Sequence, residues 1–294
     1  MSDAGREGFD RLLGELRPKL HRYCARMTGS VIDGEDVVQE TLLKALQAFD
    51  MAGPLANPEG WLFRIAHNAA LDHLRRRARD QAALSGADLE AMVDPSDPVQ
   101  DRQIAAAGLH TFMRLPVTQR SSVILMDVLG CSLEEIGRVT ESSIPAVKAA
   151  LHRGRGRLRE MANEPDDRPL PRLAEPERAR LAAYIDRFNA RDFDTVRAML
   201  ADDVRLELVN RRRLRGRSEV QNYFHNYDKA AHWHFMPGFV DRRPAILVRD
   251  PKDPAGRPNY FILLDWNEGG LIGIRDFLYA PYAIEGAEVT VLAP

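Results

Sequence analysis

The stretch at residues 133–159, LEEIGRVTESSIPAVKAALHRGRGRLR, constrains the fold most, because two short amphipathic helices follow each other there with little chain between them. In the first helix, Ile136 and Val139 continue an apolar pattern at helical spacing. The second helix begins at Ser143, whose hydroxyl can cap free N–H groups. Pro145 fits its first turn, where a missing N–H donor has no cost. The stretch therefore predicts two helices joined by a tight turn.

The second of these helices has an apolar face and a cationic face. Val147, Leu151 and Leu158 share the apolar face. The basic side chains lie on the other face or near it: Lys148, His152, Arg153, Arg155, Arg157 and Arg159. This distribution suits a helix-turn-helix whose second helix lies in the major groove of DNA. An ordinary amphipathic helix with a solvated basic face is the alternative.

Length and cysteine content limit the class of protein. The 294 residues allow two or three domains, each able to bury a core. Cys24 and Cys131 stand in neither C-x-x-C nor Cys/His metal spacing, so we expect reduced thiols and no metal site. No apolar run approaches the roughly 18 residues that span a bilayer, and the N-terminus lacks the pattern of a secretion signal. We therefore expect a soluble cytoplasmic protein with no membrane segment.

Two amphipathic helices are predicted before residue 50. The first covers Phe9–Met27, with apolar residues at steps of three and four. The second covers Asp33–Phe49, and its first-turn carboxylates complement the helix dipole. Its inward face holds Val38, Leu42, Ala45 and Phe49. Its outward stripe, which is by default a solvated face, holds Asp33, Asp36, Gln39, Glu40 and Leu43.

A third helix is predicted over Trp61–Arg77, after a loop at residues 50–60 whose prolines fix its path. One exposed face of this helix carries polar side chains at steps of three and four: Arg64, Asn68, Asp72 and Arg75. Arg76 and Arg77 extend the cationic end. An aromatic start, amides and guanidinia along one face and a basic end suit unpaired bases and phosphates. Favourable placement of cations at the negative end of a helix dipole is the alternative.

Two sets of motifs resemble a known family. Region two of the extracytoplasmic-function (ECF) sigma factors is similar to D-G-E-D-V-V-Q-E-T at Asp33–Thr41 and to W-L-x-R-I-A-x-N-x-x-x-D-x-x-R-R at Trp61–Arg76. Region four of that family is similar to Leu115-Pro116 with Gln119-Arg120, to E-E-I-G at Glu134–Gly137 and to V-K-x-x-L-H-R-G-R at Val147–Arg155. The two sets occur in the order and at the spacing of the family, and they cover roughly the first 160 residues.

The resemblance implies a transcription-initiation factor without enzymatic activity or cofactor, whose partners are core RNA polymerase and promoter DNA. The β′ clamp helices of the polymerase would be bound by Asp33, Asp36, Val37, Gln39, Glu40 and Leu43. The melted −10 element would be held by Asn57, Trp61, Arg64, Asn68, Asp72, Arg75, Arg76 and Arg77. The loop at Asn57 would receive a flipped base. The −35 duplex would be read by Ser142, Ser143, Lys148, His152, Arg153 and Arg155.

The second set of motifs departs from the family at the turn and in the recognition helix. Glu141 stands where a glycine usually turns the corner. Ala146, Ala149 and Ala150 occupy positions where polar residues often reach bases. Because fewer hydrogen-bonding groups face the groove, we expect phosphate contacts and DNA shape to carry more of the −35 recognition.

The chain continues beyond these two regions with a different pattern. Helices are predicted at Leu181–Phe188 and Phe193–Leu200, a strand at Val204–Leu208, a helix after Ser218, and strands at Phe239–Val248, Tyr260–Trp266 and Leu271–Leu278. Asn267-Glu268-Gly269-Gly270 is a hairpin signal. Helices followed by a meander imply an α+β fold. The layout is similar to the cone-shaped SnoaL-like domains.

These patterns together predict a multidomain protein with two all-α modules followed by an α+β cone-shaped SnoaL-like domain. The expected segments are region two at residues 1–80, an acidic linker at 81–107, region four at 108–162, a proline-rich linker at 163–177 and the SnoaL-like domain at 178–294.

The C-terminal domain also offers candidate acid–base residues, which are His232, His234, Tyr260, Asp265 and Asp276. Strand alternation places Tyr260 and Asp265 on opposite faces of one strand. A fold does not imply an activity. We therefore interpret the domain as regulatory, in contact with the sigma modules, with a ligand or with both. The basic stretch Arg211–Arg217 is either a solvated hairpin tip or a contact to DNA or to the acidic linker.

Two alternatives to a sigma factor stay open at this point. A ligand-sensing helix-turn-helix regulator would need only duplex contacts, and it would leave residues 33–43 and 61–77 without a purpose. An enzyme of the SnoaL-like type fused to DNA-binding modules would need a reactive pocket.

Overall fold

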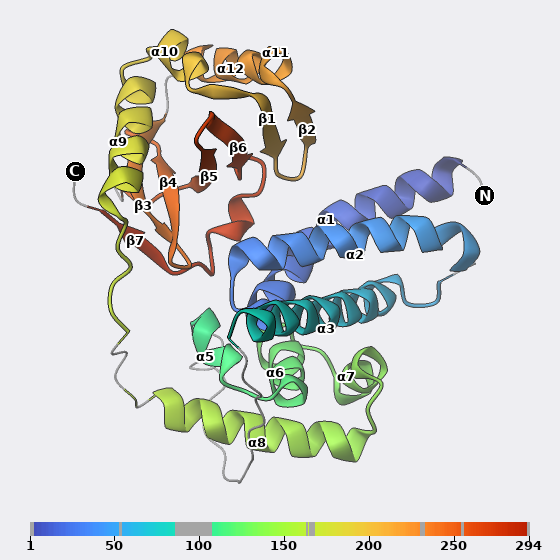
Figure 1. Cartoon of the computed structure of the whole chain (residues 1–294). Coiled ribbons are helices and arrows are strands. Elements are labelled where there is room, and N and C mark those ends of the chain that lie inside the picture. The colour runs from blue at the N-terminus through green and yellow to red at the C-terminus, as the bar shows by residue number, and fades with distance from the viewer. Residues whose placement is uncertain are drawn as a thin grey trace. The chain divides into compact units, whose positions relative to one another are not determined.

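The computed structural model describes residues 3–52, 55–85, 108–162, 164, 168–229, 233–253 and 256–292. The chain divides into two compact units, Met1–Asp166 (unit 1) and Asp167–Pro294 (unit 2). Helices fill unit 1, and unit 2 combines helices with a seven-stranded sheet (Figure 1). The predicted order of all-α modules followed by an α+β domain is confirmed. Within the described residues, no helix is long and apolar enough to cross a membrane.

Unit 1 contains all of the helices predicted in the first part of the chain. In Figure 1, α8 lies along α6 and α7, and each of α1, α2 and α3 packs against the other two. Helix α3 runs past residue 80, where the first module was expected to end, because residues 78–85 are mostly good helix formers. The elements are α1 (Asp3–Thr28), α2 (Val31–Ala52), α3 (Pro58–Ser85), α5 (Leu109–Met113), α6 (Val117–Val123), the π-helical turn η1 (Ile124–Val128), α7 (Leu133–Thr140) and α8 (Ile144–Ala162).

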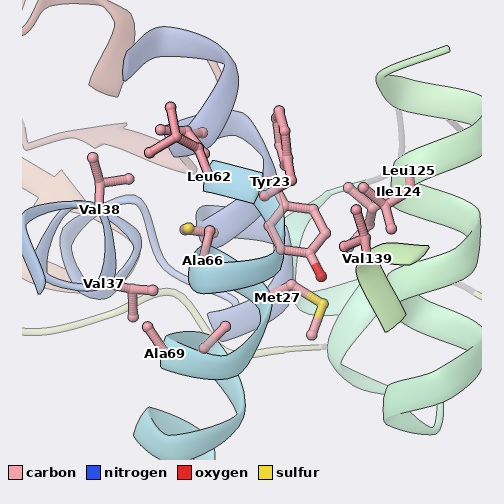
Figure 2. Close-up of a cluster of buried hydrophobic side chains, with 14 of the residues drawn as sticks. Tyr23, Met27, Val37, Val38, Leu62, Ala66, Ala69, Ile124, Leu125 and Val139 are labelled. Carbon is pink, nitrogen blue, oxygen red and sulfur yellow. The ribbon is translucent and has the colours of Figure 1, made fainter. Parts of the chain in front are cut away.

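The two predicted modules of unit 1 share a single hydrophobic core. Figure 2 shows Tyr23 of α1 between the α3 side chains and the side chains of η1 and α7. The core joins α1, α2 and α3 to the second module through Tyr23, Met27, Val37, Val38, Leu62, Ala66, Ala69, Phe112, Leu115, Ile124, Leu125 and Val139. The helical pattern predicted these apolar faces, but it did not show that the faces of the two modules cover each other.

Arg120 fastens α6 to the end of α1. Its side chain is only 5% exposed. Its guanidinium donates to the carbonyl oxygen of Met27 at 2.6 Å and to those of Met113 at 3.1 Å and Leu115 at 2.9 Å. Met27 lies in the last turn of α1, where carbonyl oxygens have no partner within the helix. Burial lowers the pKa of Arg120 to about 10, so the group stays charged at neutral pH.

Unit 2 is built on a mixed sheet with the strand order β2-β1-β6-β5-β4-β3-β7. Strands β1 and β6 are parallel, and the other neighbours are antiparallel. Helix α9 packs on β3, where Phe188 stacks on Phe235 with ring centroids 4.2 Å apart. The elements are α9 (Glu175–Asn189), α10 (Phe193–Ala198), β1 (Leu200–Leu208), β2 (Arg212–Arg215), α11 (Arg217–Val220), η2 (Gln221–Tyr223), α12 (Phe224–Lys229), β3 (His234–Val240), β4 (Arg243–Arg249), β5 (Tyr260–Asn267), β6 (Gly270–Asp276), η3 (Pro281–Ala283) and β7 (Val289–Val291).

Three local predictions for unit 2 differ from the structure. The expected strand Phe239–Val248 is a hairpin of β3 and β4, because Asp241 and Arg242 turn the chain with φ of 47° and 66°. Two-residue hairpin turns of this kind favour Asn-Gly or Asp-Gly, and Arg242 in the place of the glycine weakens the local signal. The basic stretch after β1 contains the strand β2 instead of a loop only. The helix expected after Ser218 is split into α11, η2 and α12.

Replacing Arg120 with Met should destabilise unit 1 by about 2–3 kcal/mol. The buried carbonyl oxygens that accept hydrogen bonds from the charged guanidinium would be left without a donor. Native-state hydrogen exchange of the α1 and α6 amides in the full chain measures this free energy. Arg114→Met is the matched control, since Arg114 is exposed and pairs with Glu164 at the surface. Equal protection in both variants would contradict the assigned role of Arg120.

Candidate polymerase and nucleic-acid interface

Helix α2 presents only part of the predicted polymerase-binding set to solvent. Asp36 is exposed, and Leu43 is 58% exposed, which is unusual for a large apolar side chain. The outward orientation expected for Asp33 is wrong, since this side chain is buried and accepts a hydrogen bond from Arg77 of α3 at 3.4 Å. Val37 lies in the core. The surface available on this helix is therefore centred on Asp36 and Leu43.

The remaining two members of that set lie at the edge of this surface. Gln39 and Glu40 are half-buried. Glu40 accepts from Arg76 of α3 and from Lys44, each at 2.8 Å. These bonds outweigh burial and lower the pKa of the Glu40 carboxyl. Glu40 therefore joins the surface of α2 to the basic end of α3.

The polar face predicted for α3 is present, and its cations are paired. Arg64 and Asn68 are exposed, and Asp72 is half-buried. Each arginine near the end of this face lies beside a carboxylate, with Arg75 at 3.1 Å from Asp72, Arg76 at 2.8 Å from Glu40 and Arg77 at 3.4 Å from Asp33. These pairs fix the three guanidinia in different directions around the end of α3.

The start of α3 has the geometry of a capped helix against an aromatic cluster. The Asn57 side-chain oxygen accepts from the backbone N–H of Gly60 at 2.9 Å, one residue before the half-buried Trp61. The Trp61 ring lies 6.2 Å from that of Phe9, which itself stacks on Phe49 at 3.8 Å. Trp61 is thus anchored in the core on one side, and Asn57 is exposed beside it.

One member of the predicted −10 set contacts the helix-turn-helix directly. Arg64 of α3 forms an ion pair with Glu141, which follows α7. Glu141 has a left-handed backbone with φ of 54°, a conformation that glycine usually adopts. The two residues are 77 positions apart in sequence, so no local pattern could reveal their contact. The unusual Glu141 therefore links the two modules within unit 1.

His67 lies beneath this contact. Its side chain is buried, and its Nδ1 is 2.7 Å from the Tyr23 hydroxyl. Burial lowers the pKa of His67 from 6.5 to about 4, and the nearby Glu141 carboxylate opposes this only in part. The imidazole is therefore neutral at physiological pH.

The helix-turn-helix forms as predicted, with an additional cap on its first helix. Ser132 and Glu135 exchange hydrogen bonds in a capping box at the start of α7. Ser143 accepts from the backbone N–H of Ala146 at 3.4 Å, which confirms its predicted capping role. Gly154 permits the close approach of α8 to α6, because a Cβ there would lie 2.8 Å from a methyl carbon of Val123.

The predicted −35 residues differ in how freely they face solvent. Ser143, Lys148 and His152 are exposed, whereas Ser142 and Arg153 are half-buried.

The Arg155 side chain binds a residue of its own helical module. Its Nε donates to Asp127 of η1 at 2.9 Å, and the Asp127 carboxylate is almost completely buried. Beside it lies a groove of 340 Å³ whose lining combines apolar and basic side chains: Met126, Leu133, Lys148, Leu151, His152, Arg155 and Arg159.

Among the described acid–base candidates of unit 2, Tyr260 and Asp276 belong to one hydrogen-bonded cluster, and His234 and Asp265 lie outside it. His232 lies outside the described residues. Asp265 is exposed while Tyr260 is buried, which confirms that they face opposite sides of β5. His234 is half-buried, and burial together with Arg249 lowers its pKa.

Asp276 is the most deeply buried of the candidates that the structure describes. It accepts from the hydroxyls of Tyr223 at 2.7 Å and Tyr227 at 2.8 Å and from the backbone N–H of Leu278 at 2.8 Å. Burial raises the pKa of the Asp276 carboxyl, and these donors oppose the shift. Tyr227 also lies 3.1 Å from the hydroxyl of Tyr260. The cluster joins the helical segments after β2 to the sheet.

Family models match both halves of unit 1. Residues 12–80 match Sigma-70 region 2, and residues 109–158 match Sigma-70, region 4. The ECF RNA polymerase sigma factor SigE of Mycolicibacterium smegmatis is 30% identical over 161 residues, which are 53% of this chain and 62% of that protein. The RNA polymerase sigma factor CarQ of Myxococcus xanthus is 32% identical over 166 residues, which are 55% of this chain and 93% of CarQ. The chain thus spans about three fifths of SigE and nearly all of CarQ.

These matches define the class as RNA polymerase sigma factors of the sigma-70 type. Within that class, the chain belongs to the extracytoplasmic-function family, since it is 31% identical to the ECF RNA polymerase sigma factor SigM of Mycobacterium tuberculosis over 153 residues, which are 52% of this chain and 76% of SigM. Among solved structures, the extracytoplasmic function sigma factor SigJ of Mycobacterium tuberculosis aligns with 91% of this chain and 95% of its own, at 18% identity and a TM-score of 0.35.

The buried His67 should make unit 1 sensitive to acid. The pKa of His67 is lower in the folded chain than in the unfolded chain, so the unfolded chain binds a proton first as the pH falls. The free energy of unfolding is therefore highest above pH 6.5 and decreases as the pH falls toward 4. The expected loss is up to about 3 kcal/mol. Hydrogen exchange of the α1 and α3 amides between these pH values measures it. His67→Gln lacks the titrating group, so a variant with the unchanged acid response would refute this assignment.

Proposed function

We propose that the chain is a transcription-initiation sigma factor that binds core RNA polymerase in the cytoplasm and directs it to −35 and −10 promoter elements without covalent chemistry. The observation that carries this proposal is that unit 1 contains both sigma regions in order. The three candidate binding surfaces, one each on α2, α3 and α8, therefore belong to one compact unit. A helix-turn-helix regulator would use only the face of α8. That alternative leaves the exposed Leu43 and the arginines at the end of α3 without a function.

Each face has a partner of matching chemistry. The exposed part of α2, with Asp36 and Leu43 and the flanking Gln39 and Glu40, binds the β′ clamp helices. The surface of α3, from Asn57 and Trp61 at its start to the arginines at its end, holds the melted −10 strand through stacking and phosphate contacts. The N-terminal half of α8 enters the −35 major groove.

For the division of the chain we propose region two at residues 1–80, a linker at 81–107, region four at 108–162, a linker at 163–177 and a regulatory domain at 178–294. Two of these bounds shift by a few residues, because α3 continues to Ser85 and α9 begins at Glu175.

The closed packing of unit 1 has to open for this function. The −35 and −10 elements lie about 25 base pairs apart, which is roughly 85 Å of duplex at 3.4 Å per base pair. A compact body of the size of Met1–Asp166 has a radius of gyration of only about 15 Å. One closed unit cannot reach both elements. We therefore propose that binding to core polymerase separates α3 from α7 and frees Arg64 from Glu141.

Run-off transcription with purified core polymerase tests the proposal. Asp36→Arg should abolish specific transcripts from a genomic promoter library, because it reverses the charge at the centre of the exposed α2 surface. Glu15→Arg, an exposed position on α1, is the control of equal charge change and should retain them. Transcripts that survive Asp36→Arg with unchanged yield would sink the α2 assignment. Silence of the unaltered chain, with duplex binding intact, would favour the ligand-sensing regulator.

Glu141→Gln tests the opening step. An exposed ion pair contributes about 0.2–1 kcal/mol, so its loss should increase binding of the free full-length protein to a single-stranded −10 oligonucleotide by about 1.5- to 5-fold. Fluorescence anisotropy measures this affinity. Glu134→Gln, an exposed carboxylate on the same helix α7, should leave it unchanged. A decrease in affinity for Glu141→Gln would contradict the proposed masking of Arg64.

A further inference from the structure

The basic stretch of unit 2 lies at the free edge of its sheet. Residues 211–217 read RRRLRGR, and they include β2, which is the first strand in the sheet order. Arg212, Arg213 and Arg215 are exposed along this strand. Neighbouring side chains on a strand point to opposite faces, so these guanidinia surround the edge instead of covering one face.

Carboxylates nearby neutralise only some of these arginines. Glu207 of β1 binds both Arg213 at 2.9 Å and Arg275 of β6 at 3.0 Å. Asp202 lies 3.5 Å from Arg217. In the part of the chain that the structure describes, no carboxylate forms an ion pair with the remaining members of the edge, which are Arg205, Arg211, Arg212 and Arg215.

Two of these unneutralised arginines face each other across the strands. Arg205 of β1 is directly opposite Arg215 of β2 in the antiparallel register, and both are exposed. Like charges at directly opposite positions destabilise a strand pair. An anion held between the two guanidinia would remove this repulsion. At the turn before β2, the Arg211 guanidinium lies 4.5 Å from the centre of the Tyr279 ring, which orders a further cation there.

We propose that this basic edge (Arg205, Arg211, Arg212 and Arg215) binds the phosphate backbone of duplex DNA. The guanidinium group binds phosphate oxygens in a bidentate manner. A strand of this length extends over about 13 Å, along which each strand of a duplex presents about four phosphates. Contacts of this kind are independent of base sequence. The proposal rests on the sigma-factor function for the presence of DNA, but the binding itself does not require polymerase.

Edge protection is the competing explanation, because charged side chains keep the edges of sheets from pairing with other chains. It requires charge at β2 but no affinity for DNA. The salt dependence of DNA binding separates the two explanations. Each phosphate contact releases counterions and contributes about 0.9 to the slope of log affinity against log salt concentration.

The test measures anisotropy of the full-length chain on a duplex of about 30 base pairs without promoter elements, between about 50 and 200 mM NaCl. The double variant R212Q/R215Q should lower the magnitude of the slope by about 2. R212K/R215K keeps the charges and should keep the slope. R178Q/R187Q is the matched control, because these exposed arginines of α9 pair with Glu175 and Asp192.

An unchanged slope in R212Q/R215Q, or an equal decrease in the α9 control, would overturn the proposal. So would an equally salt-dependent affinity of the unaltered chain for polyglutamate, since that would show attraction to any polyanion. Run-off transcription with the unaltered chain reports on the sigma-factor function separately. If the unaltered chain yields no transcripts while the slope of R212Q/R215Q decreases as expected, the proposed sigma-factor function is wrong and the proposed DNA binding by the basic edge is supported.

Discussion

The guanidinium of Arg120 determines how unit 1 is assembled, because a group that stays charged must find hydrogen-bond acceptors when it leaves water. It finds them in carbonyl oxygens at the end of α1 and around the α5–α6 connection. One of these acceptors, the carbonyl oxygen of Met27, belongs to the first helical module, so this hydrogen bond ties α6 to the end of α1. The apolar side chains around Tyr23 are then covered from both modules, so residues far apart in sequence form one core.

Local structure followed from sequence where it depends on near neighbours. The apolar periodicity predicted α1, α2 and α3, and the position of Ser143 predicted the start of α8. The β3–β4 turn has only a weak local signal, since Asp241 and Arg242 both adopt left-handed backbone angles and Arg242 stands where such turns usually carry glycine. The sequence pattern predicted two separate helical modules and not the core that they share. No local pattern marks the backbone carbonyl oxygens that accept hydrogen bonds from the buried Arg120.

The candidate interface shows the same division between local and distant causes. Helical spacing identified the polar faces of α2, α3 and α8, but it could not show which polar side chains another element covers. Asp33 is covered by α3, and Arg155 is held by the buried Asp127. In unit 2, strand alternation separated Tyr260 from Asp265, while the tyrosine donors around Asp276 come from helices more than 45 residues away in sequence.

The contact between α3 and α7 also sets how strongly any partner that needs the modules apart can bind. Only the open fraction of molecules is competent, so the apparent dissociation constant equals the intrinsic constant divided by that fraction. Each 1.4 kcal/mol or so by which the closed form is favoured therefore weakens apparent binding about tenfold. The packing of Val139 and its neighbours thus determines the partner concentration at which half of the molecules are bound. A substitution that adds or removes one methyl group in this packing can raise or lower that concentration without altering a residue that the partner contacts.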